Sequence, residues 1–283
     1  MRSQGQDAWY ESSASITTTP IGKLFAAIFN FIVDTATVAE LEARKLHHDP
    51  TELLTRAVQP ALWLLIFGEV LAQIRAIPTG NISYMNFMTP GILAQSVLFI
   101  AIFSGIAVIW ERDLGILHKM LASPAPRAAL ISGKALSAGE RGLSQAAIVY
   151  LLALCLGVNI VWSLPAILGV VFVVILASAL FSTFSLIVSC LVKTRERFMG
   201  VGQLLTMPFF FASNALYPIS IMPRWLQAIS RINPLTYEVD ALRGLMVIGG
   251  VAVYGILVDF AVLLASTSVL VIIAARLYPR VVV

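Results

Sequence analysis

The chain has 283 residues, of which 59% are hydrophobic and only 12% are charged, and its formal net charge is +4. A soluble domain carries about 25% charged residues, so this composition excludes a chain with a sizeable soluble domain. It predicts an all-α membrane protein that crosses the bilayer several times. The positive charge does not indicate nucleic acid as a partner, because the basic residues gather on one side of the predicted membrane topology.

Residues 1–36 are predicted to form a cytoplasmic tail followed by an amphipathic segment. The first 20 residues are polar and lack the apolar stretch of a signal peptide. The stripe of apolar residues over Ile21–Ile32 is shorter than the roughly 20 residues that a span requires, which favours a helix on the membrane surface. His47 and His48 are adjacent, so they point about 100° apart on a helix, and no metal site is predicted.

Six apolar segments are predicted to span the membrane. They cover residues 57–74, 90–110, 143–162, 165–192, 198–217 and 248–275. With the N-terminus inside, 15 of the 19 Lys and Arg residues fall on the cytoplasmic side and 4 fall outside. Because cytoplasmic loops are enriched in Lys and Arg, both termini are predicted to be cytoplasmic.

The segment 111–141 between the second and third spans carries five basic residues and is therefore predicted to be cytoplasmic. Leu114, Leu117 and Leu121 recur at helical spacing and predict a short amphipathic helix, which Pro124 would end. Such a helix can dock into a groove on another protein. The alternative is a solvated loop that lies on the lipid headgroups.

The segment 218–247 is predicted to lie outside, although one side of it is apolar. Asn233 and Pro234 divide it into two helical pieces, which fits two short helices that dip back into the outer leaflet. The alternative is an interfacial loop anchored by Trp225 and Tyr237.

The order of residues in these two segments, and in a shorter upstream stretch, resembles the ABC-2 type transporter permeases. These are membrane subunits of bacterial ABC exporters, and the chain is similar to the daunorubicin-resistance type of drug efflux permease. The residues that carry the resemblance are Asp49, Pro50, Gln59 and Pro60 upstream, Glu111, Arg112, Gly115, Leu117, Leu121, Pro124 and Arg127 in the cytoplasmic segment, and Asn233, Pro234, Tyr237, Asp240 and Arg243 in the outer segment.

This resemblance implies an ABC-2 transmembrane domain over residues 37–283. Its six transmembrane helices would follow a cytoplasmic surface helix near residues 37–45, with re-entrant helices between spans 5 and 6. The seven cytoplasmic residues would couple the chain to a nucleotide-binding ATPase subunit, and a second permease copy, identical or a close paralogue, would complete the pump in the inner membrane. His118 and Lys119 depart from the family, which often has an acidic residue there, so the charge pairing with the ATPase subunit is expected to differ.

No motif in the sequence predicts an enzyme. The pair Gly133 and Lys134 is followed by Ala135 and lacks the upstream glycine of a P-loop, and no metal-protease, disulfide or serine-hydrolase motif is present. No cofactor is therefore expected in this chain, and the resemblance implies that the partner subunit binds ATP and Mg²⁺.

Polar and aromatic residues within the predicted spans mark a candidate substrate path. Polar residues there face the helix bundle or a water-filled path, although hydrogen bonds between helices, at about 0.6 kcal/mol each, explain them equally well. The family places its path between spans 2 and 5. The candidates are Glu69, Gln95, Phe99, Phe210, Asn214 and Tyr217.

An aromatic and weakly polar path suits a flat hydrophobic drug or antibiotic. A lipid or lipid-linked glycan is the alternative substrate within the family. A passive channel or a membrane receptor is the alternative from another class of protein, and a neighbouring subunit with a P-loop would distinguish the pump from both.

Overall fold

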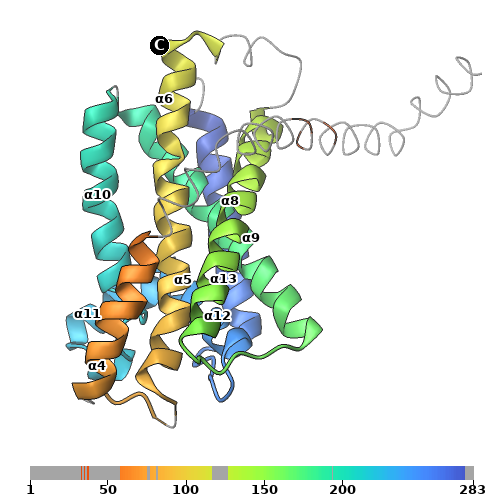
Figure 1. Cartoon of the computed structure of the whole chain (residues 1–283). Helices are drawn as coiled ribbons and strands as arrows, with labels where there is room; N and C mark the ends of the chain where they lie inside the picture. The colour runs from red at the N-terminus through yellow and green to blue at the C-terminus, as the bar shows by residue number, and fades with distance from the viewer. Residues whose placement is uncertain are drawn as a thin grey trace, which may run out of the picture.

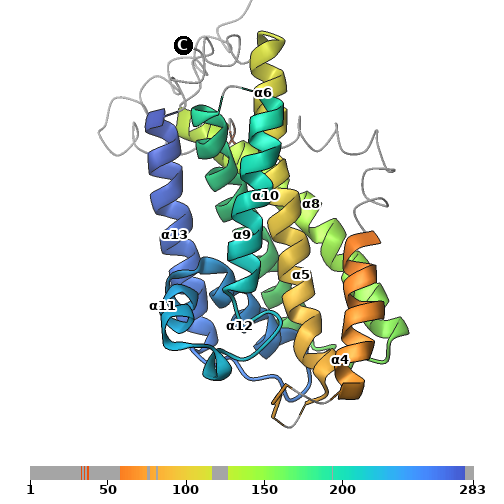
Figure 2. The same ribbon diagram turned by 90° about the vertical axis from the view of Figure 1, so that its left-hand side faces the viewer.

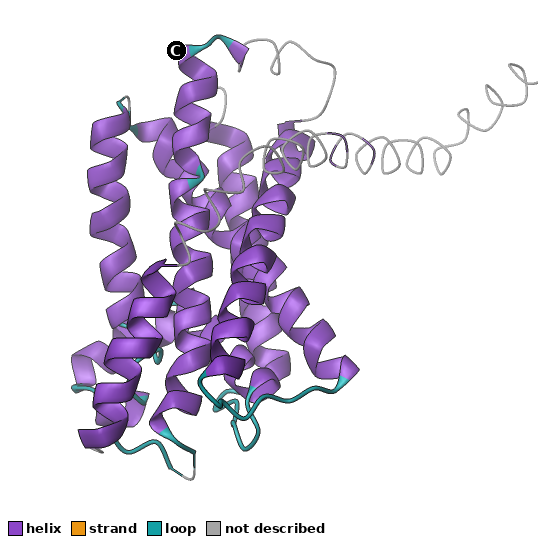
Figure 3. Ribbon diagram, viewed as in Figure 1, coloured by secondary structure: helices purple, strands orange, loops and turns teal. Residues whose placement is uncertain are grey.

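The computed structural model describes residues 33, 35, 37, 58–74, 77–80, 82–116, 127–192 and 194–277. This part of the chain is almost entirely helical and contains no strand, and Ile160 and Val247 form an isolated bridge (Figure 3). The all-helical prediction is therefore confirmed for the described residues. The predicted surface helix near residues 37–45, apart from Thr37, lies outside them, as do Leu117, Leu121 and Pro124.

Three helices are long and apolar enough to cross a membrane: Tyr84–Asp113, which comprises α5 (Tyr84–Phe103) and α6 (Gly105–Asp113), then α9 (Leu164–Leu191) and α13 (Ile256–Leu277). A fourth apolar helix, Val58–Ile74, is shorter and contains the π-helix η1 (Trp63–Gly68) and α4 (Glu69–Ile74). These lengths match the roughly 20 residues that a bilayer requires, as expected for a membrane protein.

The remaining helices are α8 (Arg127–Cys155), α10 (Arg195–Phe211), α11 (Arg224–Ile232) and α12 (Pro234–Met246), with a 3₁₀ turn η2 (Ile219–Ile221). Figures 1 and 2 show the ends of α6 and α13 and the start of α10 at one end of the bundle, and α4, α11 and α12 toward the other. Helix α9 packs against α5, α8, α12 and α13 at the centre.

Small residues let α9 approach its neighbours closely. A Cβ on Gly142 of α8 would lie 2.2 Å from Oγ of Ser178 on α9. Because water does not drive helices together inside a membrane, close backbone approach of this kind supplies the packing.

Ser185 of α9 explains why the long helix is interrupted between α5 and α6. Its hydroxyl donates to the carbonyl oxygen of Ile102 and accepts a hydrogen bond of 3.1 Å from the amide of Gly105. A side chain inserted into the backbone ladder is a recognised cause of a break in a helix. Only a residue without a side chain fits here, because a Cβ on Gly105 would lie 2.2 Å from that hydroxyl.

Two helices begin at residues that differ from the predicted boundaries, and a capping side chain or a glycine explains each difference. The second span was expected from residue 90, but α5 starts at Tyr84, after Ser83 accepts a hydrogen bond from the amide of Asn86. The sixth span was expected from residue 248, but α13 starts at Ile256, directly after Gly255, whose φ is 91°. Left-handed backbone of this kind is typical of a turn outside a helix.

Helix α8 differs most from the prediction. A span was expected at residues 143–162, whereas α8 begins at Arg127 and ends at Cys155. The charged residues of its first half were taken as part of the loop. Beyond its end, Gly157 has φ of 71° and the amide of Val158 donates to the carbonyl of Ala153, which is the usual glycine-terminated end of a helix.

Helix α6 ends inside the stretch that was predicted to form the amphipathic helix. Asp113 is its last residue, Leu114 lies in the turn with 66% of its surface exposed, and Gly115 has φ of 69°. The prediction that the amphipathic helix includes Leu114 is therefore wrong. The physical reason is the glycine, which adopts a conformation that ends the helix.

Helix α10 is shorter than the predicted fifth span. The span was expected to reach residue 217, but the helix ends at Phe211. Side chains satisfy the carbonyl oxygens of its last turn: Asn233 donates to Phe209 (2.7 Å), Ser213 to Phe210 (2.7 Å) and Tyr217 to Phe211 (2.5 Å). These bonds replace the next helical turn, so Asn214 and Tyr217 do not continue a stripe on α10.

Candidate functional site

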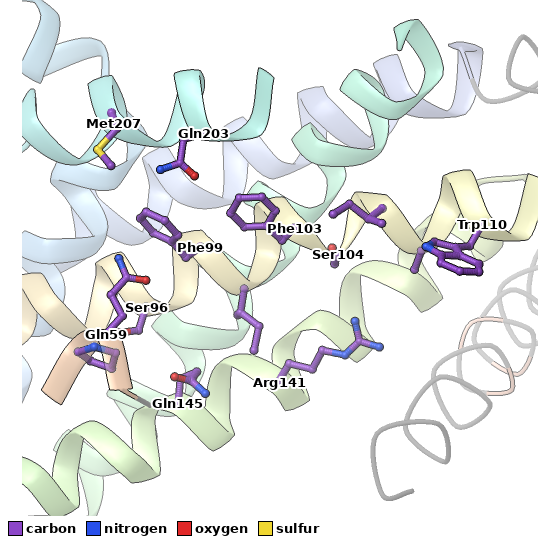
Figure 4. Close-up of a pocket in the computed structure, with 14 residues that line it drawn as sticks. Gln59, Ser96, Phe99, Phe103, Ser104, Trp110, Arg141, Gln145, Gln203 and Met207 are labelled. Atoms are coloured by element: carbon purple, nitrogen blue, oxygen red, sulfur yellow. The ribbon is translucent and has the colours of Figure 1, made fainter. Parts of the chain in front are cut away.

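A groove of about 730 Å³ runs along the α5–α6 helix (Figure 4). The α5–α6 helix forms its floor, with α8 on one side and α10 on the other. Its lining residues are Gln59, Pro60, Ser96, Phe99, Ile100, Phe103, Ser104, Ile106, Ala107, Trp110, Arg141, Gln145, Gln203 and Met207. Between Ser96 and Trp110 it follows about 21 Å of helix, at 1.5 Å per residue.

Aromatic rings lie on the floor of the groove, and amide side chains stand on its sides. Phe99 and Phe103 lie one turn apart with ring centroids 6.1 Å from each other, and Met207 faces them from α10. Gln203 of α10 and Gln145 of α8 contribute amides. Such a lining, apolar with a few polar groups, is typical of sites that bind small molecules.

A chain of charged side chains joins the end of α6 to the start of α10. Asp113 accepts from Arg112 at 3.1 Å and from Arg195 at 3.0 Å. The guanidinium of Arg195 also lies 3.5 Å from the ring centroid of Trp110, which lines the groove. These are surface interactions of small individual strength, but they link Trp110 and the end of α6 to the start of α10.

A second and more buried ion pair joins α6 to α8. Nζ of Lys134 lies 2.5 Å from Oε2 of Glu111, and the two side chains are only 11% and 7% exposed. Glu111 belongs to the predicted coupling set, and its contact with Lys134 places it beside the first half of α8. Arg112 is the next residue and Gly115 lies in the turn after α6, whereas the side chain of Arg127, at the first position of α8, lies outside the described residues.

The predicted path residues are divided between the groove and the core. Phe99 lines the groove. Gln95 is buried on another face of α5, Phe210 is 1% exposed with its ring 5.6 Å from that of Trp63, and Glu69 is exposed on α4. The structure thus brings one of the six into the cavity.

The other two path candidates support the junction between α10 and α12. The carbonyl of Asn214 accepts a hydrogen bond of 2.7 Å from Arg243, and its amide nitrogen lies 3.5 Å from Oδ1 of Asp240. Tyr217 closes the end of α10. Arg243 also lies 3.9 Å from the ring centroid of Phe87, so these contacts hold α12 against α5.

The residues of the outer segment motif position α11 and α12. Asn233 caps α12 by accepting from the amide of Leu235 at 3.0 Å, and Pro234 occupies the first turn, where a missing N–H costs nothing. Tyr237 donates to the carbonyl of Arg231 on α11 at 2.7 Å. The second carboxylate oxygen of Asp240 accepts from the amide of Tyr254 at 2.8 Å.

Sequence reasoning missed most of the groove. Phe103 follows Phe99 by four residues, and Gln145 follows Arg141 by four, so helical spacing relates each pair. Arg141 and Gln145 fall on either side of the predicted boundary between the loop and the third span. The sequence therefore gave no sign that the two residues share one face of a helix. A helix assignment across residues 127–155 would have found it.

Comparison with known proteins assigns relatives to the chain. The sequence model of the family described as "ABC-2 type transporter" matches residues 34–247. The chain is 29% identical over 236 residues to the putative transport permease ycf38 of Cyanophora paradoxa, which covers 82% of this chain and 77% of that protein. It is 25% identical to the daunorubicin resistance ABC transporter permease protein DrrB1 of Streptomyces coeruleorubidus, over 70% of each chain. It is also 24% identical to the inner membrane transport permease YadH of Escherichia coli K12, over 74% of this chain and 82% of that one.

Proposed function

This chain belongs to the ABC-2 type transporter family, and we propose that it is the membrane subunit of an ATP-driven exporter in a bacterial inner membrane. A separate nucleotide-binding subunit would bind ATP and Mg²⁺, and two permease copies would face each other. The similarity to DrrB1, a daunorubicin resistance permease, supports an amphipathic drug or antibiotic as the substrate.

We place six transmembrane helices at Val58–Ile74, Tyr84–Asp113, α8, α9, α10 and α13, with α11 and α12 re-entering the outer leaflet. The end that holds the start of α10 and the end of α13 would be cytoplasmic. Support comes from the positive-inside bias and from the position of α12, whose residues pack against α5, α9 and α13. Irregular backbone survives at membrane depth when it is buried in protein in this way.

The observation that carries the proposal is the groove on the α5–α6 helix. It combines aromatic and amide side chains, it lies between the helices that the family uses for its path, and its floor continues into the predicted coupling segment. A push on that segment by the ATPase subunit would act on α6 directly. The Glu111–Lys134 and Asp113–Arg195 pairs would pass the movement to α8 and α10.

The test replaces aromatic rings in the groove and measures drug resistance. In cells that express the chain with its ATPase subunit, Phe99→Ala and Phe103→Ala should each change the resistance profile over a panel of amphipathic drugs. One aromatic contact contributes about 0.5–1.5 kcal/mol, so affected compounds should shift by roughly twofold to tenfold.

Phe172→Ala is the matched control, because this phenylalanine is exposed on α9 and does not line the groove. Its profile should equal that of the unchanged chain at matched expression. If the groove variants also leave every compound unchanged, the substrate path lies elsewhere or the substrate is not a drug, and a lipid-linked substrate would then be tested.

A further inference from the structure

One side of the groove carries a positive charge. Arg141 lies two turns beyond Lys134 on α8, about 10 Å farther along the helix than the Glu111–Lys134 pair. If α8 spans the membrane as proposed, Arg141 lies within the span rather than in the predicted cytoplasmic loop, and a charged residue there typically faces a water-filled cavity with a function. Figure 4 shows the Arg141 side chain between α8 and the floor of the groove.

Gln145 lies one turn further and is buried without using all its donors. Its side chain is 1% exposed, and its Nε2 has no hydrogen-bond partner in the part of the chain that the structure describes. A buried donor without an acceptor costs about 1–3 kcal/mol, so a polar group of this kind calls for a partner. A ligand in the groove would supply the missing acceptor.

The charge balance of the groove selects the sign of that ligand. Among the lining residues that belong to the described part of the chain, Arg141 is the one charged side chain and none is Asp or Glu. Arg141 also has an interaction within the chain, but a guanidinium carries five N–H donors and can serve a ligand as well. Arg141 and Gln145 therefore present donors from one face of α8, next to a floor of aromatic rings.

We propose that Arg141 and Gln145 form a subsite for the anionic head group of an amphipathic substrate, whose apolar part lies along Phe99, Phe103 and Met207. This inference rests on the proposed function and narrows it to substrates with a carboxylate, sulfonate or phosphate group. The head group exchanges its water for the guanidinium and the amide, which together supply two to three charge-assisted hydrogen bonds. An uncharged analogue loses that part of the binding and keeps the apolar part.

The test uses two fluorescent probes that differ in one group: 11-(dansylamino)undecanoic acid and its uncharged primary amide. Binding is measured with the full chain, in complex with its ATPase subunit, in nanodiscs of uncharged lipid. The unchanged protein should bind the acid more tightly than the amide. Arg141→Gln and Gln145→Leu should each weaken binding of the acid by about tenfold to a hundredfold and leave binding of the amide within twofold.

Arg276→Gln is the matched control for the loss of one positive charge, because Arg276 is exposed at the end of α13 and does not line the groove. Unchanged binding of the amide in all variants also shows that they remain folded. Equal affinity of the unchanged protein for acid and amide, or an unaltered preference for the acid in both α8 variants, overturns the subsite but leaves the groove as a drug path. If neither probe binds the unchanged protein, both the subsite and the proposed path are wrong.

Competition identifies the source of the anion. Lysophosphatidic acid represents a lipid head group, and 8-anilinonaphthalene-1-sulfonate represents a soluble aromatic anion. Displacement of the acid probe by either one supports the subsite and assigns it to that source, provided that Arg141→Gln weakens the competitor in parallel. A probe that neither anion displaces is bound elsewhere, which contradicts the proposal.

Discussion

At the residue scale, the Glu111–Lys134 pair shows how one contact can join the end of α6 to α8. The two groups are 2.5 Å apart and almost fully buried, so solvent screens them little. Burial of two charges costs free energy, which their mutual contact helps to offset. The pair therefore fixes where α6 meets α8 more than it adds to the overall free energy of unfolding.

A double-mutant cycle tests this interpretation. Glu111→Leu and Lys134→Met should each lower stability by about 3–5 kcal/mol, because each leaves the other charge buried without this partner. The double variant should be less destabilised than the sum of the two. Thermal unfolding in detergent gives the values, and additive losses would show that the pair is not energetically coupled.

Two phenylalanines, Phe99 and Phe210, show how much of the site could be predicted from the sequence. Phe99 was expected in the path because it lies on an apolar span with polar neighbours, and the structure places it on the groove floor. Phe210 has the same character, yet it packs into the core against Trp63. Helical spacing cannot distinguish a core face from a groove face when both are aromatic, because only the neighbouring helices decide which one is covered.

At the element scale, close packing of α5 depends on a glycine. A Cβ on Gly91 would lie 2.4 Å from the carbonyl oxygen of Ala215, in the irregular segment that follows α10. Backbone atoms cannot move aside as a flexible side chain can. The glycine therefore lets α5 touch the turn that ends α10.

Gly91→Ala should consequently destabilise the protein by roughly 1–3 kcal/mol through overpacking. Gly200→Ala is the control, since Gly200 lies in α10 and a Cβ there would meet no atom within 4 Å. The control should be neutral or gain up to about 1 kcal/mol, because alanine favours a helix more than glycine does. Equal melting temperatures for the two variants would contradict the close contact.

The helices differ in how well the sequence predicts them, and the reason is local. Helix α9 is strongly apolar and carries no charged residue, and its observed ends, Leu164 and Leu191, lie within one residue of the predicted 165–192. Helix α8 mixes charges with apolar residues, so hydropathy located only its second half. The end of α10 depends on Asn233 and Tyr217, whose hydrogen bonds to the last turn arise from the tertiary fold rather than from any local signal.

At the scale of the whole molecule, the family and the helical architecture are established, whereas the pump is our proposal. The groove and the ion pair between Glu111 and Lys134 form one continuous stretch along α5, α6 and α8. A pump must couple this stretch to ATP hydrolysis in another subunit. A passive channel with the same groove would need no such coupling.

The most direct test measures transport in sealed vesicles that contain the chain and its ATPase subunit, with the ATP-binding side facing outward. Uptake of a drug to which the chain confers resistance should require ATP and Mg²⁺ and should proceed against a concentration gradient. Leu117→Asp with Leu121→Asp, in the segment outside the described residues, should abolish uptake while the dansyl amide probe still binds. Uptake that is equal with and without ATP, or that persists in the double variant, would contradict an exporter driven through this segment.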